Sequence, residues 1–272
     1  MRDKEWVAKG RNLGYNSCGL FCVPAAQFGT MKIPSKIEPS PLVEAVVDVR
    51  FMPDIPPAAV FGYVHGLLKG RYGDISGLPI LQVPEEIREK DPNLIFQPYY
   101  RMVNKPFVLQ LGPRVFNLAA LDPAYPGWNS FRNEICGIFG ALSENGVIGD
   151  IARVGIRYIN FFEFNVFEVT NFFVALGDTS LSNHKTLLRV QFSDDGFETT
   201  VQVTNDGNLR IGKQPKRGSV VDLDTYYLRP PLVEKRDQGF LDLIEIAHRI
   251  LKQRFFSGLK KEFVASLNPQ YE

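Results

Sequence analysis

Short runs of alternating apolar and polar residues, separated by turn-forming residues, are the feature that most constrains this chain. Residues 42–51 show the two-residue periodicity of a strand with one buried face. Similar strand-length runs cover residues 93–103, 107–111, 114–121, 152–164, 185–192, 197–204 and 218–228. Asp194-Asp-Gly196 and Asn205-Asp-Gly207 follow two of these runs and supply the residue types that tight hairpin turns require. The pattern predicts antiparallel meanders.

Helical periodicity separates these groups of strands. Apolar residues recur at the 3.6-residue spacing of amphipathic helices in residues 60–68, 128–144 and 240–263. Residues 169–176 are a shorter helical candidate, because Thr170 or Asn171 can cap a helix start. Each half of the chain then contains a strand, a helix, a three-stranded meander and a second helix.

This order predicts a duplicated α+β fold, with largely antiparallel sheets and helices packed on one face. The first half spans residues 34–150, the second spans residues 151–272, and the two are expected to form one compact unit. Residues 1–33 lie outside this order. They loosely resemble an export signal, but Pro24 interrupts the apolar run. We expect a poorly ordered leader or an over-extended translation start there.

Composition narrows the class of protein. The 272 residues include 31 basic and 30 acidic side chains, a net charge of +1, which does not favour a duplex DNA-binding surface. The apolar runs are shorter than the roughly 18 residues that a membrane-spanning helix needs. The 3 cysteines, Cys18, Cys22 and Cys136, are too few for a disulfide framework in a chain of this size. We therefore expect a cytoplasmic protein with no membrane span.

Enzyme motifs are missing from the sequence. It has no P-loop, no Rossmann glycine pattern, no nucleophile elbow and no HExxH motif. Its 3 histidines, His65, His184 and His248, include no pair at i, i+4 spacing, and Cys18 and Cys22 have no further ligands nearby. We predict no metal, no cofactor and no catalytic residues.

Arginines within an apolar strand are the first candidate site. Arg153 and Arg157 share one strand face, with Gly155 between them. Gly155 leaves room for two guanidinium groups to converge on one carboxylate, phosphate or helix end. One interpretation is a structural network with carboxylates such as Glu44 or Asp48, or with Glu163. The other is a patch that binds an anion or a nucleotide.

Four further residues complete the candidate site. Tyr158 and Asn160 share the opposite strand face with Val154 and Ile156. Trp128 follows Tyr125-Pro-Gly127 and is expected to join the start of a helix to the sheet. His248 lies beside the apolar stripe of the last helix, where it can bond to Asp222, Asp224 or Tyr226, or act as a general base.

Five short motifs resemble the TIGR04255 family, a sporadically distributed group of prokaryotic proteins. They are the segments at residues 41–51, 111–118, 125–128, 153–160 and 247–248, which occur in the family's order. The resemblance covers about residues 31–265. It implies a small accessory protein, in a defence-type setting, and supplies no catalytic residues.

These observations favour a non-enzymatic protein that binds another protein through an exposed sheet face or edge. Sheet aromatics would anchor the partner, and Arg153 and Arg157 would give polar specificity. One alternative is an enzyme or a binder of small anionic ligands, with a pocket between Arg157 and His248. A third is a single-strand nucleic-acid binder that uses Lys213, Lys216 and Arg217.

Overall fold

The computed structural model describes residues 32–121, 125–211, 214–228 and 236–271. The predicted leader, residues 1–33, lies outside this part of the chain except for Lys32 and Ile33. The strands are β1 (Leu42–Pro53), β2 (Gly73–Gly77), β3 (Tyr100–Asn104), β4 (Phe107–Gly112), β5 (Val115–Leu121), β6 (Ile148–Phe162), β7 (Ala175–Leu176), β8 (Thr179–Ser180), β9 (Thr186–Asp194), β10 (Phe197–Ile211) and β11 (Gln214–Leu228). The α-helices are α1 (Val60–Leu68), α2 (Glu85–Lys90), α3 (Trp128–Glu144), α4 (Arg236–Gly258) and α5 (Lys261–Ser266). Short 3-10 helices are η1 (Pro57–Ala59), η2 (Pro79–Gln82) and η3 (Val166–Glu168).

One antiparallel sheet organises the molecule. Its strand order is β2-β3-β4-β5-β1-β6-β11-β10-β9, and β7 and β8 form a separate hairpin. The first strand of each half pairs with the last strand of its own meander, β1 with β5 and β6 with β11. The two halves meet where β1 pairs with β6. The predicted boundary at residues 150 and 151 therefore falls inside the central strand β6.

The two faces of the sheet differ in chemistry. Along β1 the side chains of Ala45, Val47, Val49 and Phe51 are fully buried. Register places the first three of these residues beside Tyr158, Ile156 and Val154 of β6, on what we call the helix face. The intervening residues of β1, β6 and β11 include the charged side chains of these strands and form the polar face.

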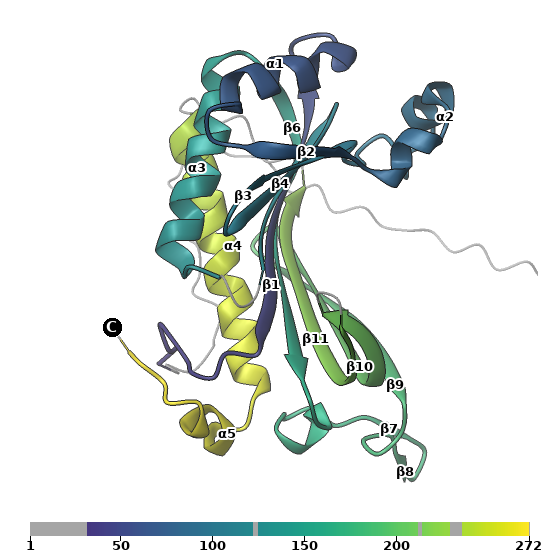
Figure 1. Cartoon of the computed structure of the whole chain (residues 1–272). Helices are drawn as coiled ribbons and strands as arrows, with labels where there is room; N and C mark the ends of the chain where they lie inside the picture. The colour runs from purple at the N-terminus through teal and green to yellow at the C-terminus, as the bar shows by residue number, and fades with distance from the viewer. Residues whose placement is uncertain (1–31, 122–124, 212–213, 229–235, 272) are drawn as a thin grey trace, which may run out of the picture.

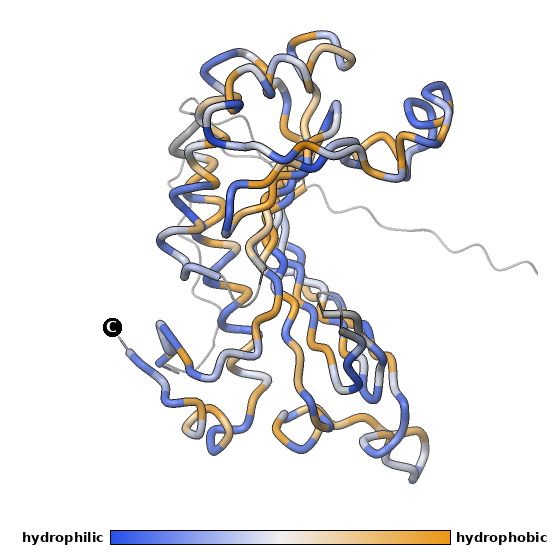
Figure 2. The backbone as a smooth tube through the Cα atoms, in the orientation of Figure 1, coloured by the Kyte–Doolittle hydropathy of each residue, from blue (hydrophilic) through white to orange (hydrophobic). Residues whose placement is uncertain are grey.

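Helices cover the helix face. Figure 1 shows α3 and α4 lying side by side against the sheet, with α1 above them and α2 projecting on the other side. The buried side chains of α3 recur at helical spacing, as predicted: Phe131, Ile135, Ile138, Phe139 and Leu142. Phe139 stacks on Phe240 of α4, with ring centroids 3.7 Å apart. In Figure 2, hydrophilic residues follow the outer side of α3 and hydrophobic residues follow its inner side.

The structure corrects the predicted helix in the second half. Residues 169–176 form no α-helix: residues 169–174 connect η3 to β7, and residues 175 and 176 form β7. The Asn165 side chain accepts a bond from the backbone N–H of Phe167, which caps a single 3-10 turn instead. The backbone of residues 169–171 then bonds to residues 258–260 at the end of α4. Tertiary contacts therefore override a weak local helical preference.

Three predicted boundaries are also wrong. The strand predicted at residues 93–103 begins only at Tyr100. Asn205-Asp-Gly207 is not a turn, because β10 continues through it with a shift in register and Asp206 at φ 54°. A positive φ serves a bulge as well as a turn. The last predicted helix divides, since α4 ends at Gly258 and α5 starts at Lys261. In the described part of the chain, no helix has the length and hydropathy needed to span a membrane.

Candidate binding site

Arg153 ties three central strands together on the polar face. Its Nη2 donates to both carboxylate oxygens of Asp224 at 2.8 Å, and its Nη1 donates to Asp48. A Cβ at Gly155 would lie 2.7 Å from Nη1, so the missing side chain makes room for the guanidinium. Burial lowers the pKa of Arg153, but Asp224 and Asp48 outweigh it and hold the pKa above its usual value. Arg153 is 8% exposed, and both of its terminal guanidinium nitrogens donate to these carboxylates.

Arg157 shares this face, as the strand periodicity predicts, but binds a different carboxylate. Its Nε and Nη2 donate to the two oxygens of Asp222 at 2.8 and 2.5 Å, and these bonds raise its pKa. The two guanidinium groups therefore do not converge on one anion. The arrangement matches the predicted structural network, with Asp48 as a member. Glu163 instead pairs with Lys216 at 2.7 Å.

The next two candidates lie on the helix face. Asn160 is buried, and its amide donates to the backbone carbonyl of Val221 at 3.2 Å. The hydroxyl oxygen of Tyr158 lies 3.3 Å from that of Tyr125. Burial raises the pKa of Tyr158, and Tyr125 adds to the effect. Both side chains therefore bond to other residues of the same molecule.

Trp128 and His248 form a stacked pair between α3 and α4. Their ring centroids are 3.7 Å apart at 15°, and the Trp128 indole N–H donates to Glu245 at 3.3 Å. Trp128 therefore joins α3 to α4, rather than to the sheet as predicted. Burial lowers the pKa of His248 to about 3, with Lys252 contributing, so the imidazole is neutral near pH 7.

The pocket expected between Arg157 and His248 does not form. Arg157 lies on the polar face, whereas His248 contacts Tyr158 on the helix face. The predicted bonds of His248 to Asp222, Asp224 or Tyr226 are wrong for the same reason. A small cavity of about 130 Å³ is lined by Tyr158, Asn160 and His248, without Arg157.

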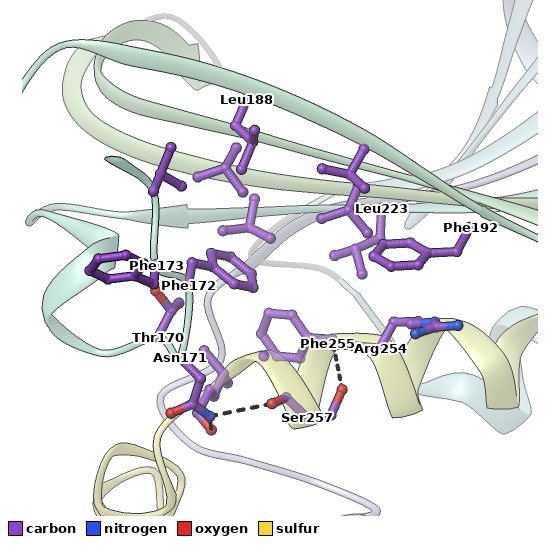
Figure 3. Close-up of a pocket in the computed structure, with 17 residues that line it drawn as sticks. Thr170, Asn171, Phe172, Phe173, Leu188, Phe192, Leu223, Arg254, Phe255 and Ser257 are labelled. Atoms are coloured by element: carbon purple, nitrogen blue, oxygen red, sulfur yellow. Dashed lines mark hydrogen bonds between the residues drawn. The ribbon is translucent and has the colours of Figure 1, made fainter. Parts of the chain in front are cut away.

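An apolar cavity of about 360 Å³ lies elsewhere on the helix face, and the sequence did not predict it. Its walls are the side chains of β9, β10 and β11, the end of α4, and residues 170–174 (Figure 3). This volume is near the lower end of the range for small-molecule sites, roughly 300–1,000 Å³. Arg254 lines one end, paired with Asp194 at 2.5 Å and 4.3 Å from the ring centre of Phe192.

The strand beside this cavity is an edge of the sheet. Among the described residues β9 pairs only with β10, so its other edge has no strand partner. Asp195 and Gly196 both have positive φ, which indicates a two-residue type I′ turn. The residues flanking such a turn exchange hydrogen bonds, and bonded pairs alternate along the ladder. The outward backbone groups therefore belong to Leu187, Arg189, Gln191 and Ser193.

Of the three cations proposed for nucleic-acid contact, the two that the structure describes lie in β11 and are paired. Lys216 pairs with Glu163, and Arg217 pairs with Asp206 at 2.5 Å. Lys213 lies outside the described residues. Within the described ranges, no cluster of three or more His, Cys, Asp or Glu side chains is placed to hold a metal ion.

The fold and this site define an α+β protein with a nine-stranded antiparallel sheet and an apolar cavity beside β9, an edge that has no second strand partner among the described residues. No family model matches the chain, and no curated protein matches it. The resemblance to the TIGR04255 family stays a prediction.

Proposed function

We propose that the protein is a non-enzymatic binding module that accepts an extended segment of a partner protein as an additional strand on β9. The observation that carries this proposal is the edge of β9 beside the apolar cavity, which has no strand partner in the part of the chain that the structure describes. Strand addition uses main-chain hydrogen bonds for affinity and side-chain pockets for specificity. Both features are present at this edge.

The composition of β9 supports the proposal. Edge strands are usually protected by proline, charged side chains, bulges or short length. β9 is 9 residues long, contains no proline or lysine, and has Arg189 and Asp194 as its charged residues. Its pairing with β10 is continuous from Thr186 to Asp194. β2, at the opposite edge, has 5 residues and an irregular register.

The alternatives have less support. The enzyme or anion-binder hypothesis requires Arg157 and His248 in one pocket, but they lie on opposite faces of the sheet. Nucleic-acid binding requires available cations, yet Lys216 and Arg217 are paired with carboxylates. Arg153 is buried in its network, so the proposal does not rely on the arginine pair for specificity.

We also propose that the two halves arose by duplication. Support comes from the strand order, since β1-β5-β4-β3 and β6-β11-β10-β9 run outward from the centre in the same sequence order. Membership of the TIGR04255 family, an accessory role in a prokaryotic cell and a cytoplasmic location complete the proposal. They rest on the sequence motifs and on cysteine content.

A proline at Gln191 tests strand addition directly. Gln191→Pro removes one outward N–H without removing a bond to β10, and edge strands tolerate proline. Gln191→Ala is the matched control, because both changes remove the side-chain bond to Glu198. Affinity purification from the native host should recover a partner with wild type and Gln191→Ala but not with Gln191→Pro.

Urea unfolding should show that both variants are folded. In the complex of the wild-type protein with its partner, hydrogen exchange should show new protection of the Leu187, Arg189 and Ser193 amides. Equal recovery of the partner by the proline and alanine variants would exclude β9 as the binding edge.

A further inference from the structure

The apolar cavity opens at the edge of β9. Val203, Leu223 and Val221 line its floor and are at most 3% exposed. Val190 of β9 is 38% exposed and Phe173 is 87% exposed, so these two lie at the mouth. Figure 3 shows the lining side chains between the strands and α4. A group that enters the cavity therefore passes the unpaired edge of the sheet.

The register of an added strand decides which of its side chains reach this mouth. Directly opposite residues in neighbouring strands place their side chains on the same face. Leu188, Val190 and Phe192 point to the helix face and line the cavity. Residues opposite these three would therefore point toward the cavity, where only apolar groups match the walls.

The intervening residues meet different chemistry. Leu187, Arg189, Gln191 and Ser193 carry the polar-face side chains of β9. Arg189 is exposed and forms no ion pair with any residue that the structure describes. An acidic side chain opposite Arg189 would gain the favourable cross-strand pairing of opposite charges.

We infer that the segment bound on β9 alternates apolar and acidic residues, with one large apolar side chain seated in the cavity. This inference rests on the proposed function and specifies the partner's chemistry. The apolar positions supply affinity by burial, and an acidic position opposite Arg189 fixes which face of the segment turns toward the cavity.

Defined probe peptides test this pattern. The first is a labelled seven-residue peptide in which three phenylalanines alternate with four glutamates. The second has the same composition with the phenylalanines adjacent, and the third has lysine in place of glutamate. Fluorescence anisotropy should show the tightest binding for the first. The second should bind about tenfold more weakly, because fewer aromatic side chains reach the cavity in any register.

Two variants separate the cavity from the charge. Val201→Phe fills the cavity from its half-buried wall and should weaken the first probe about tenfold to hundredfold, whereas Val201→Ala should have a smaller effect. Arg189→Glu should weaken the glutamate probe roughly twofold to fivefold and improve the lysine probe by a similar factor. Urea unfolding should confirm that each variant is folded.

The outcomes distinguish the two proposals. If Gln191→Pro abolishes probe binding while Val201→Phe and Arg189→Glu leave it unchanged, strand addition stands and the inferred pattern fails. Equal binding by Gln191→Pro and Gln191→Ala would overturn both. Failure of all three probes to bind overturns the inferred pattern. Sedimentation that shows a dimer dissociated by Gln191→Pro would mean that a second copy occupies the edge, which also overturns it.

Discussion

The centre of the sheet and its β9 edge treat polar groups in opposite ways. At the centre, Arg153 donates its hydrogen bonds to two carboxylates of the same molecule, Asp48 and Asp224. At the edge, the outward backbone groups of β9 have no strand partner among the described residues, and Arg189 has no ion pair there. The arginines embedded in an apolar strand lie at the centre. The backbone groups without a strand partner among the described residues lie at the edge.

This difference separates two roles that look alike in a sequence. Polar residues in an apolar strand indicate either a binding site or side-chain bonds that join neighbouring strands. The carboxylates of β1 and β11 are in register with the arginines of β6 and pair with them. The arginines therefore join the strands. Binding capacity is instead greatest where a regular strand lacks a neighbour.

The largest expected effect is the loss of stability in Arg153→Ala. This change leaves Asp48 and Asp224 close together without the cation that lies between them. Breaking a buried ion pair from one side costs about 3–5 kcal/mol. Asp224 is 30% exposed, so we expect about 3 kcal/mol in urea unfolding.

A triple variant provides the control. Arg153→Met with Asp48→Asn and Asp224→Asn removes the uncompensated charges and should recover much of the lost stability. If Arg153→Ala lowers the free energy of unfolding by less than about 1 kcal/mol, this network is no stronger than an ordinary surface ion pair. The centre of the sheet would then not differ from the edge in this respect.

His248 predicts an intermediate effect that depends on pH. Its pKa in the folded protein is about 3, against about 6.5 when unfolded, so the unfolded state binds the extra proton. The stability is fully present above pH 6.5 and falls as the pH drops toward 3, by roughly 1.4 kcal/mol per unit. We expect wild type to lose about 2 kcal/mol between pH 6.5 and 5 from this group.

His248→Phe keeps a ring against Trp128 and removes the titration. Burial raises the pKa of Glu44 and Asp224, so these groups increase the stability as the pH falls. Both are present in wild type and in His248→Phe, so their contributions cancel when the two stability curves are subtracted. Urea unfolding between pH 5 and 7 should show a steeper fall for wild type. Parallel curves for the two proteins would show that His248 titrates normally.

Much of the fold follows from periodicity. The runs in β1, β4, β5 and β6, the helical stripe of α3 and the Asp195-Gly196 turn were predictable, because local spacing and turn chemistry determine them. The segment at residues 169–176 was not predictable in this way. Its conformation depends on backbone bonds to the end of α4, about ninety residues away in the sequence.

The site was less predictable than the fold. Sequence spacing placed Arg153 and Arg157 on one face, but it could not identify Asp224 and Asp222 as their partners. The strand at residues 185–192 was predicted, yet its position at the sheet edge depends on strand order. The available signal was the sequence of β9, where Leu187 and Leu188 place apolar side chains on both faces.

The smallest expected effect is that of Arg157→Ala, and it tests where binding occurs. The Arg157 side chain is 49% exposed, but its partner Asp222 is only 14% exposed. Removal of the Arg157 side chain should therefore cost about 1–2 kcal/mol, between the values for an exposed pair and a buried pair. Two strands, β11 and β10, separate β6 from β9. At about 4.8 Å per strand, a segment added beyond β9 lies roughly 19 Å from Arg157. Partner affinity should therefore match wild type.

The measurement compares Arg157→Ala with Gln191→Pro against the same partner, with urea unfolding as the check on folding. A folded Arg157→Ala protein that loses the partner, beside a Gln191→Pro protein that keeps it, would move the binding surface from the edge to the polar face. The sequence-based prediction of an arginine pair that gives polar specificity would then be favoured. The opposite result assigns Arg157 a structural role, because at this distance Arg157 can influence the edge only by altering the sheet between them.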